Sequence, residues 1–388
     1  MQSATLQFSS NKIGNWISIS AINFLLILIL FFATTNTLVS FSLDKLMFFF
    51  LPVAIGMFQP DAPLLKSREA LLILLLIIST AISSVVNLTL TPMIFFPAIG
   101  LTFSYIIRKY PGIILYPLYY ALIIHMICGL ILDLMAFRGI VTPYVSGYIK
   151  GFSFLFASRG LTTTPQTFGT LCLVWLLIYF LRKKLNLNKG IDKVYYVINA
   201  ISVLSCLSRS TLIFWILILL FKDIKLFIAI FVFVFAFMIK FWEQIITFIT
   251  SSGSLVSRNQ LLEGFEISYL QSNSLPVYLF GRGTNQLSLE IAERVKWVTR
   301  LDFENGYTML LHSYGAIGLT IYLIICGWFI YQFMRIGRWA EVAILSYYFF
   351  VTQYFTQEFV SVSFYFLLSV LFVSYDLYNH KLTKLTRN

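Results

Sequence analysis

An all-α polytopic membrane protein is the fold that this sequence predicts, and three observations support it. Of 388 residues, 59% are hydrophobic and only 11% are charged, whereas a soluble domain carries roughly 25% charged residues. The mean hydropathy is +0.84. The apolar residues form long runs, such as Ile17–Leu38 and Ala70–Val86, of the length that a helix needs to cross a bilayer. We therefore expect a single integral membrane domain over residues 1–388.

The apolar runs predict about twelve transmembrane helices by their length and composition. The seventh and eighth runs are short, so they form either tilted spans or a helical hairpin that stops part-way. The first run is too long for the apolar core of a signal peptide, so we expect a retained helix. The predicted spans are residues 16–38, 42–58, 69–86, 89–107, 112–136, 167–181, 194–207, 210–221, 226–242, 306–332, 340–356 and 359–378.

Basic residues predict the orientation of these spans. In a soluble protein a net charge of +12 would suggest nucleic-acid binding, but here most Lys and Arg lie in short loops. Twelve spans place six basic groups on one face with both termini, and the enrichment of cytoplasmic loops in Lys and Arg makes that face cytoplasmic. The groups are Lys66 with Arg68; Arg108 with Lys109; Arg182, Lys183, Lys184, Lys189 and Lys193; Lys222 with Lys225; Arg335 with Arg338; and Lys381, Lys384 and Arg387.

Two longer loops then belong to the other face, residues 137–166 and 243–305, together with the short turn at Ser208–Ser210. Translocated loops normally contain few cations, so those retained here indicate an anionic ligand. Binding to lipid head groups or to loop carboxylates is the alternative for each one. The cations concerned are Arg138, Lys150, Arg159, Arg209, Arg258 and Arg282.

The 243–305 loop contains two motifs suited to binding phosphate. Ser257-Arg258-Asn259-Gln260 has the spacing of a capping box, which places Arg258 in the first turn of a helix. Free N–H groups and the helix dipole attract anions there, and a guanidinium adds bidentate hydrogen bonds. Gly281-Arg282-Gly283 predicts a tight turn in which the backbone approaches a ligand closely. An ordinary capped surface helix and an ordinary loop are the alternatives.

The end of this loop predicts a further helix and a candidate base. Residues 287–298 have the spacing of a short amphipathic helix lying on the membrane surface, with Trp297 as an interface anchor or a platform for a sugar ring. Glu304-Asn305-Gly306-Tyr307 leads into the next span. Glu304 is either a carboxylate favoured by the helix dipole or a general base whose pKa is raised by desolvation.

Ionisable residues inside the predicted spans have functional and structural interpretations. His125 and Asp133 share the fifth span and form either a proton-coupling pair or a satisfied structural pair. His312 follows Glu304 by eight positions on roughly the same helix face, and it either lines the site or packs in the core. The four cysteines lie in apolar runs without metal-ligand spacing and are expected to be packing residues.

The order of these motifs resembles that of the O-antigen ligase/polymerase superfamily, over about residues 155–320. The ligase branch has His where this chain has Glu304, and the polymerase branch is more variable there, so the polymerase branch is favoured. The matching segments are Arg159-Gly160-Leu161, Leu207-Ser208-Arg209-Ser210-Thr211, Ser257-Arg258, Gly281-Arg282-Gly283, Glu304-Asn305-Gly306-Tyr307 and Gly315-Ala316-Ile317-Gly318.

The resemblance implies a GT-C-like, metal-independent glycosyltransferase without a cofactor. Its substrates would be oligosaccharide repeat units on undecaprenyl diphosphate, joined on the periplasmic face of the bacterial inner membrane. Arg209, Arg258 and Arg282 would stabilise the leaving diphosphate, and Glu304 would be the base in a single inverting displacement. Substrate-binding roles would fall to Arg159, Trp297, Asn305, Tyr307 and His312.

The same resemblance implies a chain-length-regulating co-polymerase of the Wzz type as partner, besides membrane lipids, and no nucleic acid. Two other functions remain open at this point. An O-antigen ligase would transfer the finished glycan to lipid A-core. A flippase for lipid-linked sugars would show internal repeats and charges along a central path, and neither is evident in the sequence.

Overall fold

A computed structural model gives the fold and describes residues 19–35, 45–51, 67–88, 95–141, 157–229, 232, 242–243, 246, 261–283, 287–294, 303 and 305–385. None of these residues lies in a strand, which confirms the all-α prediction. The helices are α1 (Ile19–Ala33), α3 (Ser67–Val86), α4 (Phe96–Ile107), α5 (Pro111–Ile113), α6 (Tyr119–Phe137), α7 (Pro165–Lys184), α8 (Asp192–Ser205), α9 (Arg209–Lys222), α13 (Leu275–Phe280), α14 (Leu289–Arg294), α15 (Gly306–Arg335), α16 (Trp339–Ser346), α17 (Gln353–Phe355) and α18 (Val362–Leu385).

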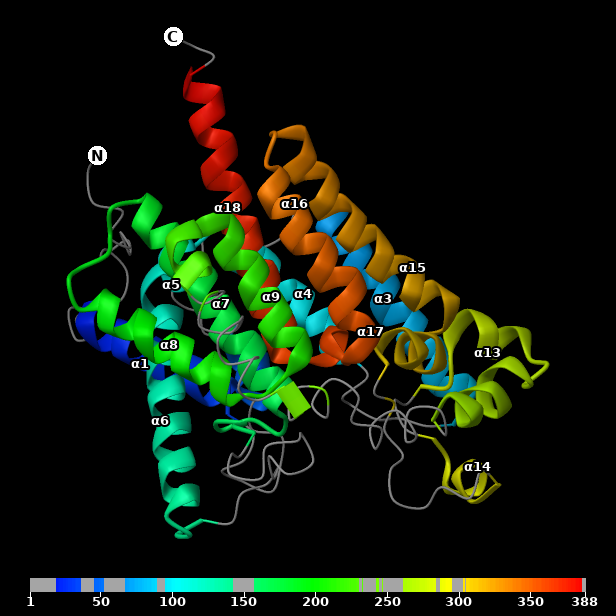
Figure 1. The fold of residues 1–388 in the computed structure, drawn as a ribbon. Coiled ribbons are helices and arrows are strands. Elements are labelled where there is room, and N and C mark those ends of the chain that lie inside the picture. Colours follow the sequence, from blue (N-terminus) through cyan, green and yellow to red (C-terminus); the bar gives the residue numbers. More distant parts are fainter. Residues whose placement is uncertain are drawn as a thin grey trace.

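Short turns of other helical types join some of these helices. Three are π-helical, namely η2 (Ile114–Leu118), η4 (Glu266–Leu270) and η5 (Tyr347–Thr352), and η6 (Glu358–Val360) is a 3₁₀ turn. In Figure 1, α15, α16 and α18 rise side by side to one end of the molecule. The small helices α13 and α14 lie at the other end of α15, where α13 packs against it.

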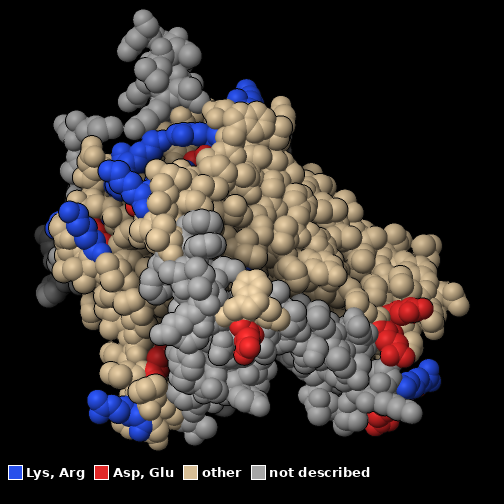
Figure 2. Space-filling model, in the orientation of Figure 1, with Lys and Arg blue, Asp and Glu red and all other residues tan. Residues whose placement is uncertain are grey.

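Basic loops from distant parts of the sequence meet at the end to which α15, α16 and α18 rise, which we call the basic end. Arg108 donates to Asp376 from Nε at 2.6 Å and from Nη2 at 2.7 Å. Lys184 and Arg338 both lie over the ring of Tyr378, 3.4 and 3.9 Å from its centroid. Figure 2 shows Lys and Arg gathered there, with smaller groups near the tips of α6 and α14. Arg108, Lys184 and Arg338, from three of the six predicted basic groups, therefore meet at one end.

The other end of the bundle, which we call the opposite end, contains the first residues of α7, α9, α15 and α18. Each of these helices finishes at the basic end. Contacts among their starts confirm the grouping, because Thr170 of α7 lies 3.5 Å from Glu358 before α18. Gly306 of α15 also packs against Thr356, whose carbonyl oxygen would lie 2.5 Å from an added Cβ.

Five of the described helices are long and apolar enough to cross a membrane, as an all-α membrane protein requires. The structure does not give the twelve spans predicted from apolar runs, since α8 and α9 have only 14 residues each. Apolarity alone does not determine where a helix ends. The predicted runs 42–58 and 226–242 lie largely outside the described residues. The five helices are Glu69–Val86, Pro111–Phe137, Pro165–Lys184, Gly306–Arg335 and Val362–Asn379.

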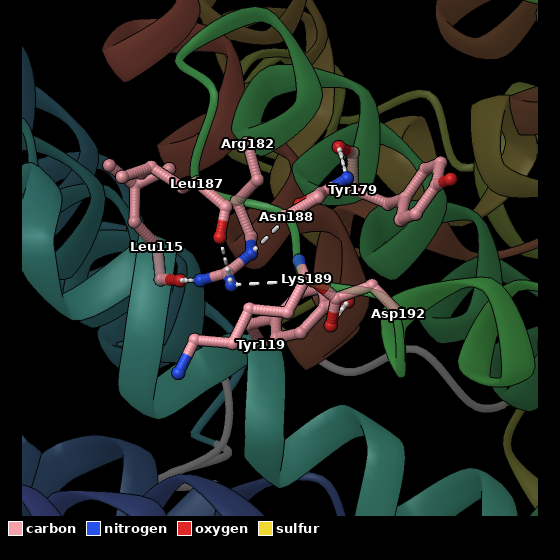
Figure 3. Close-up of polar contacts among 8 residues, drawn as sticks. All are labelled: Leu115, Tyr119, Tyr179, Arg182, Leu187, Asn188, Lys189 and Asp192. Carbon is pink, nitrogen blue, oxygen red and sulfur yellow. Dashed lines mark hydrogen bonds and ion pairs between the residues drawn. The ribbon is translucent and has the colours of Figure 1, made fainter.

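A buried cation joins three elements at the basic end (Figure 3). The Arg182 guanidinium, only 1% exposed, donates to the Leu115 carbonyl at 2.5 Å and to the Leu187 carbonyl at 3.2 Å. Leu115 lies in η2, where Pro117 interrupts regular α-helical hydrogen bonding. Asp192 lies 3.8 Å from the Arg182 Nη2 atom and supplies the balancing charge. These contacts fix α7, η2 and the start of α8 together.

Helix α15 is broken by a glycine that packs against α13. Gly315 has φ 65° and ψ −168°, a conformation in the left-handed half of backbone space that favours glycine. A Cβ at this position would lie 2.3 Å from the Leu279 carbonyl oxygen. Gly281, just after α13, has φ 75°, and its own Cβ would lie 2.6 Å from the Gly315 nitrogen. The two glycines therefore let the backbones of α13 and α15 touch.

We predict that Gly315→Ala lowers the free energy of unfolding by about 1–3 kcal/mol or more, because it adds backbone strain and a steric clash. Gly327→Ala is the matched control in the same helix, since no atom beyond the neighbouring backbone of that helix lies within 4 Å of its Cβ position. Thermal unfolding of the purified variants in detergent measures the difference. Equal stability of the two variants would contradict the packing described here.

We also predict that Arg182→Gln destabilises the fold by about 3–5 kcal/mol, because it leaves the Asp192 carboxylate buried without a charged partner. Lys183→Gln, at the exposed neighbouring position, should change stability little. Denaturation of both variants in detergent checks this. An Arg182→Gln protein as stable as the Lys183→Gln protein would show that the buried pair is dispensable.

Candidate functional site

The turn at Gly281–Gly283 is held against α15 at the opposite end of the bundle. The Arg282 N–H donates to the His312 carbonyl at 2.6 Å, and the Gly283 N–H donates to the Ser313 carbonyl at 3.2 Å. The side chain is held as well, since Arg282 Nε donates to the Ser268 carbonyl at 2.7 Å. Burial lowers the pKa of Arg282, but a guanidinium stays charged. The turn thus presents a partly exposed cation in a fixed position.

The Gly281–Gly283 turn is also hydrogen-bonded to the C-terminal end of α3. The Gly281 carbonyl accepts from Asn87 Nδ2 at 2.8 Å and from Ser83 Oγ at 3.3 Å. Ser83 is buried, and Asn87 follows the last residue of α3. The turn is therefore bonded on one side to α3 and on the other side to the break in α15.

His312 lies beneath this turn and has a packing role. Its Nε2 atom lies 2.8 Å from Ser268 Oγ, and its ring centroid lies 4.6 Å from that of Phe303. The side chain is only 1% exposed. Of the two interpretations from sequence, the structure favours the packed residue over one that lines a site. Through Ser268, His312 supports the segment that binds the Arg282 side chain.

Asn305 and Tyr307 make structural contacts at the start of α15. Asn305 Oδ1 accepts the Tyr307 N–H at 2.9 Å and the Thr308 N–H at 3.3 Å, so Asn305 is the N-cap of the helix. The Tyr307 hydroxyl donates to the carbonyls of Phe349 and Phe350 in η5, at 3.3 and 3.1 Å. These contacts anchor the first turn of α15 to η5.

The Arg159 loop and the Arg209 turn are brought together by a backbone hydrogen bond. The Ser158 N–H donates to the Ser205 carbonyl at 2.8 Å, which places the Arg159 loop beside the end of α8. Arg209 begins α9 four residues after Ser205. The next carbonyl, that of Ser210, accepts the Tyr347 hydroxyl of η5 at 3.3 Å. Arg159 and Arg209 thus both lie at the opposite end.

His125 supports the loop that carries Arg159. Its Nδ1 atom lies 3.0 Å from Thr34 Oγ1 of the segment after α1, and its Nε2 atom accepts the Leu161 N–H at 3.4 Å. A Cβ on Gly160 would lie 3.1 Å from the same Nε2 atom. Among the described residues, the hydrogen-bond partners of His125 lie directly after α1 and in the Arg159 loop, and Asp133 is not among them. These contacts agree with the structural interpretation of His125.

Three of the expected site residues lie outside the described residues, and so does the last part of the predicted amphipathic helix, residues 295–298. The three site residues are Arg258, Trp297 and Glu304. The capping box at 257–260 lies outside as well. Helix α14 is described only as far as Arg294, which pairs with Glu290 at 3.0 Å on an exposed surface. The roles assigned to these residues remain predictions.

A buried carboxylate at the opposite end was not singled out from sequence. Glu358 is 3% exposed, and three hydroxyls donate to its Oε2 atom: Tyr348 at 2.7 Å, Ser361 at 3.3 Å and Ser363 at 3.4 Å. Thr170 donates to Oε1 at 3.5 Å. Burial raises the pKa of the Glu358 carboxyl, and the hydroxyl bonds oppose this in part. The available signal was a lone carboxylate in the turn between two adjoining apolar runs.

Comparison with known protein families and with curated proteins finds no match for this chain. At the opposite end the Arg282 guanidinium is held by the Ser268 carbonyl, and Arg159 and Arg209 lie on neighbouring segments. Guanidinium groups are suited to binding phosphate oxygens.

We predict that Glu358 makes stability depend on pH. Because its pKa is raised by folding, the folded protein holds this proton more tightly than the unfolded chain. Its contribution is therefore full below about 4.3, the ordinary pKa of a glutamate, and is lost as pH rises through the raised value. Glu358→Gln should remove this component. Unfolding midpoints across a pH series, for wild type and variant, measure it, and parallel curves would contradict it.

Proposed function

We propose that this chain is an O-antigen polymerase, a membrane glycosyltransferase that joins lipid-diphosphate-linked repeat units into a long polysaccharide. The donor is a growing glycan on undecaprenyl diphosphate, and the acceptor is a single repeat unit on the same carrier. Breaking the donor bond leaves the negative charge on the diphosphate. The protein must stabilise that charge while a sugar hydroxyl attacks.

One observation supports this proposal most directly: Arg282 is held in place by its own backbone and by its side chain. Its N–H bonds the His312 carbonyl at 2.6 Å and its Nε bonds the Ser268 carbonyl at 2.7 Å. A charge that is fixed before the reaction stabilises a developing anion without reorganisation. Arg258 and Arg209 complete the cationic set in this proposal, and Glu304 is the base that receives the hydroxyl proton.

The distribution of charge supports a topology for the reaction. We assign the basic end to the cytoplasm, because it gathers the loops richest in Lys and Arg. The opposite end then faces the periplasm of the bacterial inner membrane, and both termini are cytoplasmic. In this proposal the shorter helices complete the set of spans. A Wzz-type co-polymerase sets the chain length.

We predict that Arg282→Ala abolishes chain extension without loss of the folded protein. In cells that lack the native gene, the variant should leave lipid A-core capped by one repeat unit, visible on a glycan ladder. Arg294→Ala, an exposed arginine in the same loop region, is the matched control and should give full-length chains. Arg258→Ala and Glu304→Ala should resemble Arg282→Ala.

Two results of the same experiment would contradict the proposal. Loss of all caps, the single unit included, would indicate a ligase. Full-length chains made by the Arg282→Ala protein would show that this arginine does not stabilise the leaving group. Long chains made by the Glu304→Ala protein would overturn only the assignment of the base.

A further inference from the structure

Several hydroxyl groups at the opposite end surround the Glu358 carboxyl and donate hydrogen bonds to it. Glu358 is 3% exposed, and in the described part of the chain it takes part in no ion pair. Its carboxyl oxygens accept hydrogen bonds from hydroxyls of α7, of η5 and of residues at or directly before the start of α18. A carboxylate has about four acceptor positions, so one residue can join several helices.

A first path leads from Glu358 to α9 through the aromatic residues of η5. The Tyr348 hydroxyl donates to Glu358 at 2.7 Å. The Tyr348 ring stacks on Phe214 of α9, with centroids 5.2 Å apart and an interplanar angle of 27°. The adjacent Tyr347 donates its hydroxyl to the Ser210 carbonyl at 3.3 Å. The position of η5 therefore sets the position of the first turns of α9.

A second path leads to the same turn through α7. Thr170 donates to Glu358 Oε1 at 3.5 Å, and the preceding residue is Gly169. A Cβ on Gly169 would lie 2.4 Å from Thr211 Cγ2, so α7 and α9 are in close contact at this point. Thr211 in turn donates to Ser208 Oγ at 3.0 Å, directly before Arg209. Both paths converge on the first turns of α9, at residues on either side of Arg209.

We propose that Glu358 is a positioning residue, which fixes the first turn of α9 and thereby the direction of Arg209. The inference rests on the proposed function for its catalytic consequence, because Arg209 is there one of the cations that stabilise the diphosphate. Glu358 itself touches no substrate. It acts by holding η5 and α7 against α9.

A buried native thiol gives a test that does not depend on activity. Cys206 is fully buried and lies three residues before Arg209, whereas Cys326 is fully buried in α15. Alkylation by N-ethylmaleimide, followed by mass spectrometry of the two peptides, reports local and global opening separately. Glu358→Leu should speed alkylation of Cys206 by about tenfold or more while Cys326 stays protected. Glu263→Leu, at an exposed position, is the control and should change neither thiol.

Two further variants keep the test decisive. Glu358→Gln keeps the size and the polar contacts, because hydroxyl partners can reverse their direction, so Cys206 should stay protected. Tyr348→Phe removes only one hydroxyl and should expose Cys206 to an intermediate degree. If Glu358→Leu exposes both thiols, the fold is lost and Tyr348→Phe decides the question. Unchanged Cys206 protection in Tyr348→Phe would then overturn the proposal.

Transfer of a lipid-linked repeat unit by the purified variants tests the catalytic consequence. Glu358→Leu should lower kcat by about 10–100-fold with little change in KM, since misdirecting Arg209 affects the transition state more than binding. Glu358→Gln should restore most of the rate. Wild-type kcat in the Leu variant, or protected Cys206 in it, would overturn the inference. Inactive wild-type protein would instead overturn the proposed function, and the thiol measurements would still decide whether Glu358 positions the turn.

Discussion

Backbone carbonyls that leave regular helical hydrogen bonding must find donors within an apolar protein, and this constraint organises the structure. The same solution recurs at three irregular segments, where a neighbouring element supplies the donor. At η2 the donor is the Arg182 guanidinium, which reaches the Leu115 carbonyl. At η5 the Tyr322 hydroxyl donates to the Phe349 carbonyl at 2.6 Å. At the break in α15 the donors are the backbone N–H groups of Arg282 and Gly283.

The break in α15 is the irregular segment that matters for the proposed function. The turn that donates hydrogen bonds to its carbonyls also carries the cation Arg282. A donor turn that satisfies buried carbonyls cannot leave without exposing them to apolar surroundings, at a cost of about 1–3 kcal/mol for each group. The hydrogen bonds that satisfy the α15 carbonyls therefore also hold Arg282 in position. Near Arg209 side chains make the corresponding contacts. The Tyr347 hydroxyl donates to the Ser210 carbonyl, and the adjacent Tyr348 hydroxyl donates to the Glu358 carboxyl.

The features that depend on composition and local pattern could be predicted from the sequence. Apolar runs predicted the helical membrane class, and charge in short loops predicted that Arg108, Lys184 and Arg338 share one end. The pairing of Gly281 with Gly315 could not be predicted, because the residues around a glycine do not indicate which distant backbone it will contact. Glu358 escaped notice because a carboxylate in a short turn resembles a solvated one until its hydroxyl partners are placed. The count of spans failed because apolarity does not specify helix ends.

Chain growth by the isolated protein is the most direct test of the claim that Arg282 and Arg209 serve glycosyl transfer from a lipid diphosphate. Purified wild-type protein would be incubated with a synthetic undecaprenyl-diphosphate-linked repeat unit, and the products would be analysed by mass spectrometry. We expect carriers with two or more repeat units, together with released undecaprenyl diphosphate, in the presence of a metal chelator. Folded protein that leaves the substrate unextended, with and without added divalent metal, would contradict it.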